Sequence, residues 1–203
     1  MDEVERTLAT YEGDAAAYAE KYLSESGLEA YGGPFLDRLD GGRVLDLGCG
    51  PGVDTAVFAR RGFDVVGFDV TPSFLRRARE HFVEVTADVT ADRQAEASFV
   101  RDDMRSPPFV ADSFDGIWAS GSFHHVPRKQ APDTAAALQR LLRDGGCAYI
   151  SVKREPTGSE VADRHFEFYE PGEFRALLAD AGFDVEIVET LGVRVGAVDI
   201  GTV

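Results

Sequence analysis

Cysteine and lysine are scarce in this sequence of 203 residues. Cys49 and Cys147 are the only cysteines, too few for a disulfide framework or a cysteine-rich metal site. No stretch approaches the roughly 20 apolar residues that a membrane-spanning helix needs. The acidic start, Met1-Asp2-Glu3, is not followed by the apolar run of a secretory signal. These absences predict a cytoplasmic protein without a membrane segment or a bound metal.

Basic residues number 21 against 36 acidic ones, which gives a net charge of -15. Only Lys21, Lys129 and Lys153 are lysines. The average surface would repel a nucleic-acid backbone, so the composition argues against a nucleic-acid substrate. An acidic, lysine-poor surface resembles that of proteins from salt-loving organisms, where salt screens the repulsion between carboxylates. We therefore expect a halophilic protein, with an ordinary acidic cytosolic protein as the alternative.

Strand-like and helix-like segments alternate along most of the chain. Short apolar segments at residues 44–47, 64–69, 98–101, 114–119, 147–153, 184–189 and 193–200 are typical of strands. Helical patterns occupy residues 4–31, 35–39, 54–61, 72–82, 133–143 and 171–181. This alternation predicts one α/β domain over residues 1–203, with a doubly wound, Rossmann-like, mostly parallel sheet of about seven strands and helices on both faces. Ligands bind such sheets beyond the carboxyl ends of the strands.

The segment VLDLGCGPG, residues 44–52, carries the most information about function. It is a strand that runs into a glycine-rich turn and then a helix, and glycine lets a ligand approach the backbone closely. A dinucleotide site needs its third glycine one residue later than Gly52. A phosphate-binding P-loop needs a lysine where Asp54 stands, and a carboxylate there would repel phosphate. The turn therefore favours a nucleoside without phosphates.

This segment is similar to the first motif of class I S-adenosylmethionine-dependent methyltransferases, and the resemblance extends from Tyr11 to about Glu189. It implies an enzyme whose cofactor is S-adenosyl-L-methionine. In that family the loop passes under the methionine part of the cofactor, and an acid at the position of Asp46 helps to hold its ammonium group. The resemblance thus places four loop residues in the cofactor site: Gly48, Cys49, Gly50 and Gly52.

The end of the second strand also matches this family. Asp69 follows the loop by about 20 residues, where an acid can accept both ribose hydroxyls, and the resemblance implies that Val70 packs on the adenine. A helix N-cap is the alternative role for Asp69. At the N-terminus, Tyr11 and Tyr18 resemble the lid helix of members that act on small molecules. Residues 1–40 are then expected to form a helical lid and residues 41–203 the cofactor-binding core, with Tyr18 either on the cofactor carboxylate or in an aromatic core.

A third match lies after the third strand. An aspartate of the family accepts the adenine amino group there, and the backbone N–H of the next residue, here Met104, meets the ring. Counting back six residues from Phe109 selects Asp103 over Asp102 for this role. A solvated acidic turn is the alternative.

The segment after the fourth strand completes the resemblance. Ala119 or Ser120 is expected to give a carbonyl to the cofactor ammonium. His124 and His125 are the candidate bases near neutral pH. We expect His125 to pack structurally and His124 to face the pocket as the candidate catalytic residue. A histidine pair could also suggest metal, but the sequence offers no matching ligand spacing.

The sequence therefore predicts a methyltransferase that moves a methyl group to a small-molecule acceptor by in-line displacement. A non-catalytic S-adenosylmethionine-binding protein of the same fold is the first alternative, because methyl transfer needs no signature residue. A nicotinamide-dependent oxidoreductase is the second, although the glycine spacing argues against it. The acceptor, its methylated atom and the oligomeric state do not follow from the sequence.

Overall fold

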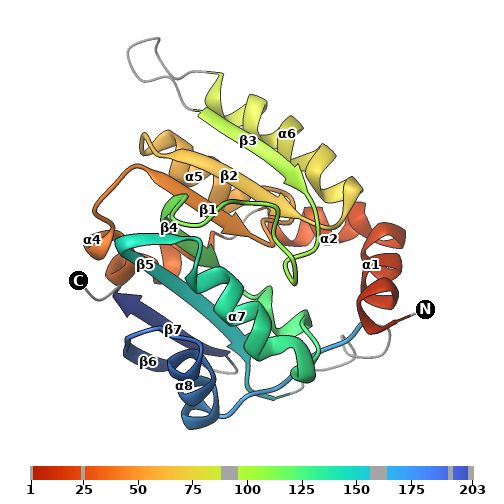
Figure 1. Ribbon diagram of the computed structural model, residues 1–203. Coiled ribbons are helices and arrows are strands. Elements are labelled where there is room, and N and C mark those ends of the chain that lie inside the picture. Colours follow the sequence, from red (N-terminus) through yellow and green to blue (C-terminus); the bar gives the residue numbers. More distant parts are fainter. Residues whose placement is uncertain (1, 24–25, 88–95, 156–163, 192–193, 201–203) are drawn as a thin grey trace.

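In the computed structural model, a twisted sheet lies between two layers of helices (Figure 1). The structure describes residues 2–23, 26–87, 96–155, 164–191 and 194–200. Its strands are β1 (Arg43–Leu47), β2 (Asp64–Asp69), β3 (Glu96–Arg101), β4 (Phe114–Ala119), β5 (Leu142–Lys153), β6 (Val185–Leu191) and β7 (Arg194–Ile200). They are ordered β3-β2-β1-β4-β5-β7-β6. Strands β1 to β5 pair in parallel, and β7 runs antiparallel between β5 and β6. The predicted α/β fold with a mostly parallel sheet is confirmed.

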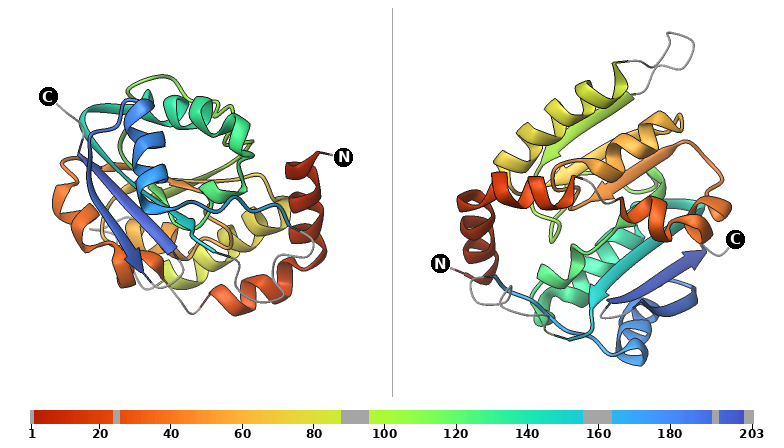
Figure 2. Two further views of the ribbon diagram at one scale, coloured as in Figure 1. Left: turned by 90° about the horizontal axis from the view of Figure 1, so that it is seen from below. Right: turned by 180° about the vertical axis from the view of Figure 1, so that it is seen from behind.

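Helices cover both faces of the sheet. The helices are α1 (Glu3–Gly13), α2 (Ala15–Tyr22), α3 (Gly27–Tyr31), α4 (Gly33–Arg38), α5 (Val53–Arg60), α6 (Pro72–Thr86), α7 (Ala131–Gln139) and α8 (Pro171–Asp180). Helices α4, α5 and α6 lie on one face, and α7 and α8 pack together on the other (Figure 2). The sheet is therefore buried on both sides, which a parallel sheet requires.

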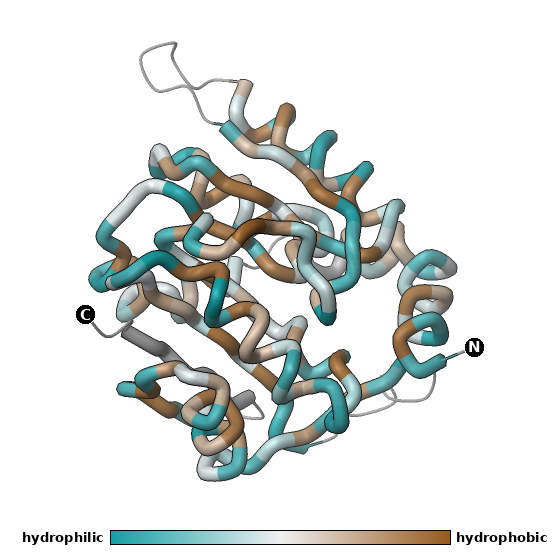
Figure 3. The backbone as a smooth tube through the Cα atoms, in the orientation of Figure 1, coloured by the Kyte–Doolittle hydropathy of each residue, from teal (hydrophilic) through white to brown (hydrophobic). Residues whose placement is uncertain are grey.

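Alternating residues of the central strands pack into two separate cores. In β1, Val44 belongs to the core under α3, α4 and α5, whereas Leu45 and Leu47 belong to the core under α7 and α8. In β4, Trp118 and Ile117 divide in the same way. Hydrophobic residues accordingly colour much of the central strands (Figure 3). Because both faces are apolar, these strands read in the sequence as continuous hydrophobic runs.

The expected helix over residues 133–143 is wrong at its end. Helix α7 ends at Gln139, and β5 begins three residues later at Leu142, which pairs with Phe114 of β4. Leu142 is drawn into the strand because it joins the same apolar core as Phe114. Gly145 lies at the resulting irregularity with a φ of +75°, so it bends a strand rather than ending a helix.

The N-terminal segment, expected as one helix over residues 4–31, is three helices. Helix α1 ends at Gly13, and α2 starts at Ala15 after a corner at Asp14. Helix α3 starts anew after Ser26, whose hydroxyl caps it by accepting the N–H of Glu29. The corners let this segment follow the surface of the fold, which one straight helix could not do.

The remaining element ends differ from expectation by a few residues, an ordinary uncertainty for helix and strand ends. The seventh expected strand is present as β7, although the side chains of residues 194–200 are not described. Residues 84–97 received no prediction: α6 continues to Thr86, β3 starts at Glu96, and residues 88–95 lie outside the described ranges. No helix in the described ranges is long and apolar enough to cross a membrane.

Candidate functional site

Two adjoining cavities lie at the carboxyl ends of β1, β2 and β4, where the strand order reverses. The first, about 90 Å³, is called the inner pocket, and its lining includes Leu8, Asp69, Val70 and His125. The second, about 710 Å³, is called the open cleft, and its lining includes Asp46, Ser120, Lys153 and Arg164. The cavities share five lining residues: Tyr11, Tyr18, Gly48, Gly50 and Gly121. They therefore meet at the glycine turn and at the N-terminal aromatic side chains.

The glycine turn follows β1 in a backbone conformation that other residues rarely adopt. Gly48, Gly50 and Gly52 have φ values of +73°, +53° and +84°. A Cβ on Gly48 would come within 2.3 Å of Cβ of Ser122, whereas nothing lies within 4 Å of a Cβ on Gly50. Gly50 thus presents bare backbone to both cavities. Gly52 lines neither cavity. A Cβ on Gly52 would lie only 2.7 Å from Cβ of Ala78, so the absence of a side chain lets α6 pack closely against the turn.

Asp69 lies at the end of β2 with only 8% of its surface exposed. Its carboxylate accepts the backbone N–H of Gly50 at 3.0 Å and that of Thr71 at 2.8 Å. Burial raises the pKa of Asp69, while these two hydrogen bonds oppose the rise. The side chain thus fixes the glycine turn and the start of α6. A carboxylate has about four acceptor positions, so capacity remains for a ligand in the inner pocket.

Asp46, in β1, is a second buried carboxylate beside the turn, with 3% of its surface exposed. It accepts the hydroxyl hydrogen of Thr55 at 2.5 Å. Burial raises its pKa well above the ordinary value, and the charges of Asp54 and Asp69 raise it further. A cation in the open cleft would relieve this repulsion, so the site is built to attract positive charge.

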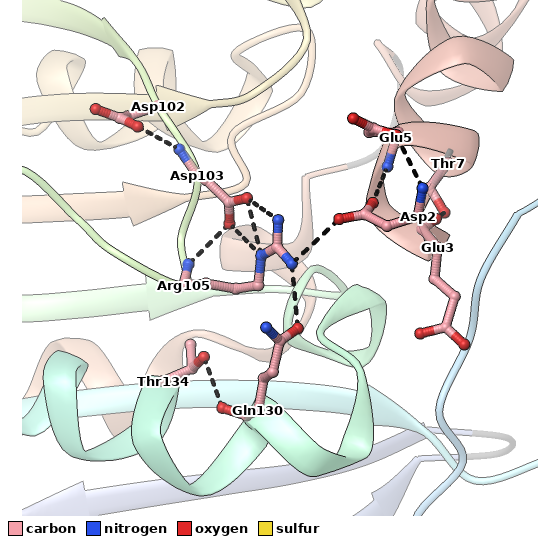
Figure 4. A network of polar contacts seen from close by, with 9 residues as sticks. All are labelled: Asp2, Glu3, Glu5, Thr7, Asp102, Asp103, Arg105, Gln130 and Thr134. Atoms are coloured by element: carbon pink, nitrogen blue, oxygen red, sulfur yellow. Dashed lines mark hydrogen bonds and ion pairs between the residues drawn. The ribbon is translucent and has the colours of Figure 1, made fainter.

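The acids after β3 are held by hydrogen bonds within the protein (Figure 4). The carboxylate of Asp103 accepts two bonds from Nε of Arg105, at 3.0 and 2.9 Å, and one from its terminal nitrogen. Arg105 also lies 3.7 Å from the carboxylate of Asp2, before α1, and donates to Gln130 at 3.1 Å. Asp102 accepts the N–H of Asp103. Both acids line the inner pocket, so the choice of Asp103 for adenine stays a prediction.

The other expected cofactor residues divide by position. Val70 and Met104 line the inner pocket, Cys49 and Ser120 line the open cleft, and Tyr18 lines both. The ring of Tyr18 also packs on Tyr11 and Phe74, with centroid distances of 5.0 Å to each, so it belongs to an aromatic cluster as well. Burial raises the pKa of the Cys49 thiol well above its ordinary value. Ala119 lies in the apolar core and lines neither cavity.

Both histidines after β4 reach the site, rather than one alone. His124 lines the open cleft and stacks on Phe166, with a centroid distance of 5.1 Å. His125 lines the inner pocket, where Nδ1 lies 2.7 Å from the carbonyl of His165 and Nε2 lies 2.9 Å from the hydroxyl of Tyr11. Burial, helped by the charges of Arg164 and Lys153, lowers the pKa of His125 to about 4. His125 therefore does more than pack: it is a neutral hydrogen-bonding group at the pocket.

The described residues contain no group of three or more histidine, cysteine or acidic side chains placed to hold a metal ion. Carboxylates, aromatic rings and cationic side chains are among the described residues that line the cavities. Helix α1, which contributes Val4, Thr7, Leu8 and Tyr11, covers the inner pocket.

A family profile described as "Methyltransferase domain" matches residues 44–146. The chain belongs to this methyltransferase family. The match runs from β1 to the irregular start of β5, so it includes the glycine turn, Asp69, the acids after β3 and both histidines. It confirms the resemblance to class I S-adenosylmethionine-dependent methyltransferases.

Relatives of this methyltransferase chain are known from sequence and from structure. A ubiquinone biosynthesis O-methyltransferase of Xanthomonas euvesicatoria is 32% identical over 74% of the chain and 66% of its own length. The biotin biosynthesis bifunctional protein BioHC of Cellvibrio japonicus is 34% identical over 69% of the chain and 26% of its own length. The chain therefore spans only part of the length of these relatives. The 1,6-didemethyltoxoflavin-N1-methyltransferase of Burkholderia thailandensis, solved with S-adenosylhomocysteine, shares the fold with a TM-score of 0.73 at 22% identity, over 98% of this chain and 88% of its own.

Sequence reasoning missed several residues of this methyltransferase site. Arg164 and Phe166 follow β5 at a distance and carry no motif, yet both line the open cleft. The contact between Tyr11 and His125 joins residues 114 positions apart, which no local pattern reveals. The signal available for Tyr11 was its place in the N-terminal segment that resembles a lid.

Proposed function

We propose that this chain is an S-adenosylmethionine-dependent methyltransferase that transfers a methyl group to a small-molecule acceptor. The observation that carries the proposal is the bare backbone of Gly50, which lines both cavities. The buried carboxylate of Asp69 lines the inner pocket beside it, and that of Asp46 lines the open cleft. This geometry suits a nucleoside that carries positive charge and no phosphate.

The residues present fit the cofactor in two parts. On the inner-pocket side, Asp69 would accept the ribose hydroxyls, Val70 and Met104 would contact the adenine, and Asp103 would accept its amino group. On the open-cleft side, the loop residues and Ser120 would face the methionine part. Asp46 offers a carboxylate to an ammonium group, which offsets the cost of keeping this acid buried and charged.

When bound, the cofactor supplies a sulfonium methyl that needs little further activation, because its leaving group is a neutral thioether. The protein has to hold the acceptor in line and accept its proton. The Tyr11 hydroxyl donates to the neutral His125 and accepts from Arg164 at 3.2 Å, so its direction is fixed. Tyr18 makes a further hydrogen bond to this hydroxyl, which is thus held among protein groups where the two cavities meet. We therefore add Tyr11 and His125 to His124 as the side chains that border the acceptor.

The N-terminal segment is proposed to act as a lid on a single domain of residues 1–203. Four separate contacts hold α1 in place: Asp2 with Arg105, Glu12 with the N–H and hydroxyl of Ser73, Thr7 with the N–H of His165, and Tyr11 with His125. They join the lid to elements on both sides of the glycine turn. Residues 41–203 then form the core that binds the cofactor.

A small molecule is the proposed acceptor for two reasons. The O-methyltransferase relative is named for the biosynthesis of a small molecule, ubiquinone, and the N-methyltransferase neighbour is named for 1,6-didemethyltoxoflavin. The net charge of -15 also opposes the approach of a nucleic acid.

Calorimetric titration with S-adenosylhomocysteine and with NAD tests the cofactor. We expect a Kd for S-adenosylhomocysteine in the micromolar range, about -8 kcal/mol, and no detectable heat with NAD. Tighter binding of NAD would overturn the proposal in favour of an oxidoreductase. A second assay follows S-adenosylhomocysteine release from S-adenosylmethionine with a pool of small metabolites in high salt. Binding without release from any pool member would point to a non-catalytic binding protein.

A further inference from the structure

Asp54, in the first turn of α5, accepts hydrogen bonds from both α3 and β4. One carboxylate oxygen accepts the hydroxyl hydrogen of Ser26 at 2.7 Å and the backbone N–H of Leu28 at 3.1 Å, both at the start of α3. The other oxygen accepts Nε1–H of Trp118, in β4, at 2.7 Å. Asp54 also lines the open cleft, so it joins three elements at the edge of that cavity.

Helix α3 depends on these bonds because it has only five residues, too few for a helix that is stable by itself in water. The N–H groups of its first turn need acceptors outside the helix. The Ser26 hydroxyl accepts the N–H of Glu29 at 3.0 Å and donates to Asp54, so the two side chains form one cap. The side chain of Leu28 is buried in the core under α3, α4 and α5. Asp54 and Leu28 therefore attach α3 to the fold at two points.

Helix α3 forms one wall of the open cleft. Its residues that line the cleft are Gly27, Glu29, Ala30 and Tyr31. A Cβ on Gly27 would lie 2.7 Å from Oγ of Ser120, so the start of α3 lies directly against the segment that follows β4. In the proposed complex Ser120 faces the methionine part of the cofactor. The position of α3 therefore sets the space that is left for that part.

Trp118 fixes the direction of the Asp54 carboxylate. Its ring is fully buried and stacks on Tyr149, with a centroid distance of 4.1 Å. It also packs on Phe35 and Phe58, with centroid distances of 5.4 and 6.0 Å. A ring enclosed in this way holds its N–H in one direction. Since Ser120 follows Trp118 by two residues, Asp54 ties α3 to the same strand end that carries the site.

We propose that Asp54 is a positioning residue, which holds α3 against Ser120 and so builds the wall of the cleft that encloses the methionine part of the cofactor. This inference rests on the proposed function. The described lining of the inner pocket, where the nucleoside part would lie, includes neither Asp54 nor a residue of α3. Loss of the Asp54 contacts should therefore weaken ligands that carry the amino-acid part and spare ligands that lack it.

The test compares S-adenosylhomocysteine with 5′-methylthioadenosine, which keeps the nucleoside and the thioether but has no amino-acid part. Adenosine is titrated as a second ligand without that part. Calorimetry on the full chain should show that Asp54→Asn weakens S-adenosylhomocysteine about tenfold or more and changes the other two ligands less than about threefold. Asp133→Asn is the matched control, because Asp133 has the same charge in the first turn of α7 and lines neither cavity. It should leave all three affinities unchanged.

The negative charge of Asp54 also attracts an ammonium group directly, so a second variant separates that effect from positioning. Ser26→Ala keeps the charge and removes the hydroxyl between Asp54 and the N–H of Glu29. We expect it to weaken S-adenosylhomocysteine about threefold or more and to spare the nucleoside ligands. The double variant should lose less than the product of the two single effects, because both act through one cap.

Trp118 is the only tryptophan, so its fluorescence reports the bond to Asp54. Asp54→Asn replaces the charged acceptor and should shift the emission maximum, whereas Asp133→Asn should not. Thermal melting of each variant checks that it is folded. Ser26→Ala carries the test if Asp54→Asn does not fold.

Three results would overturn the inference. Unchanged affinity for S-adenosylhomocysteine in Asp54→Asn would mean that the wall does not depend on this residue. An equal loss for all three ligands would mean that Asp54 supports the whole fold. A loss in Asp54→Asn with none in Ser26→Ala would assign the effect to its charge alone. Failure of the wild type to bind S-adenosylhomocysteine would refute the proposed function instead, and the titration of the wild type separates that outcome from the others.

Discussion

The hydroxyl of Tyr11 lies 2.9 Å from Nε2 of His125, although 114 positions separate the two residues in the chain. The direction of this hydrogen bond follows from the other ring nitrogen. Nδ1 lies 2.7 Å from the carbonyl of His165, which can only accept, so Nδ1 carries the proton. A neutral His125 then has a lone pair on Nε2, and the Tyr11 hydroxyl donates to it.

Tyr11→Phe should lower turnover about tenfold or more and change the Kd for S-adenosylhomocysteine by less than about threefold. The variant keeps the ring that packs on Tyr18 and Phe74 and removes only the hydroxyl, which bonds to His125 and Arg164 beside the proposed acceptor. Tyr169→Phe is the matched control, because the Tyr169 hydroxyl is buried without a hydrogen-bond partner among the described residues and lines neither cavity. Equal turnover in both variants would make the Tyr11 hydroxyl structural.

His125 should make the folded protein less stable as the pH falls from about 6.5 toward 4. Its pKa is about 4 when folded and 6.5 as the ordinary value, so between these limits the unfolded chain binds the extra proton. The stability that the neutral ring confers is complete above pH 6.5 and decreases by about 3 kcal/mol at most as the pH falls through this window. His125→Asn keeps a donor for the His165 carbonyl and does not titrate. The difference in unfolding free energy between wild type and variant should therefore shrink at acid pH; a constant difference would refute the assignment.

Asp69→Ala should weaken S-adenosylhomocysteine by about 10- to 1,000-fold, since two hydrogen bonds to a charged group would be lost. Asp69→Asn should lose less, because the amide keeps one acceptor. The contacts to Gly50 and Thr71 also stabilise the fold, so we expect Asp69→Ala to lower the free energy of unfolding by about 1 kcal/mol. Calorimetry and denaturant unfolding on one sample separate the two effects. Lower stability with unchanged affinity would mean that Asp69 acts only on the backbone.

Cofactor binding should release protons and strengthen as the pH rises through the raised pKa of Asp46. Burial and the neighbouring acids favour the protonated form of this carboxyl in the free protein, whereas an ammonium group favours the ionised form. Titration of S-adenosylhomocysteine in two buffers with different ionisation enthalpies measures the protons released. Asp46→Asn should bind S-adenosylhomocysteine more weakly and release fewer protons on binding, because the proton from Asp46 is no longer available. Proton uptake in the wild type would contradict the proposed role.

Salt should stabilise the protein. With a net charge of -15, self-repulsion is large at low ionic strength and strongly screened near 1 M, where the Debye length is about 3 Å. We expect the melting temperature to rise substantially between about 0.1 and 2 M KCl. A flat or falling curve would argue for an ordinary acidic protein rather than a halophilic one.

The sequence by itself determined the sheet, the glycine turn and the family. Residues 64–69 and 114–119 form strands as predicted, because strands buried on both faces leave continuous apolar runs. The turn after Leu47 was predictable because glycine adopts positive φ values far more readily than other residues. Single strands and the turn are local features, so neighbouring residues specify them.

Only the tertiary structure decided which distant side chains meet. The first residues of β5 were predicted as the end of a helix, because the pairing of Leu142 with Phe114 is not local. His125 and Arg164 both form hydrogen bonds with the Tyr11 hydroxyl, so three distant parts of the chain meet there. Such contacts depend on how the lid, the loop after β4 and the segment after β5 pack over the strand ends. No periodicity records that packing, because each segment reads separately as an ordinary helix or loop.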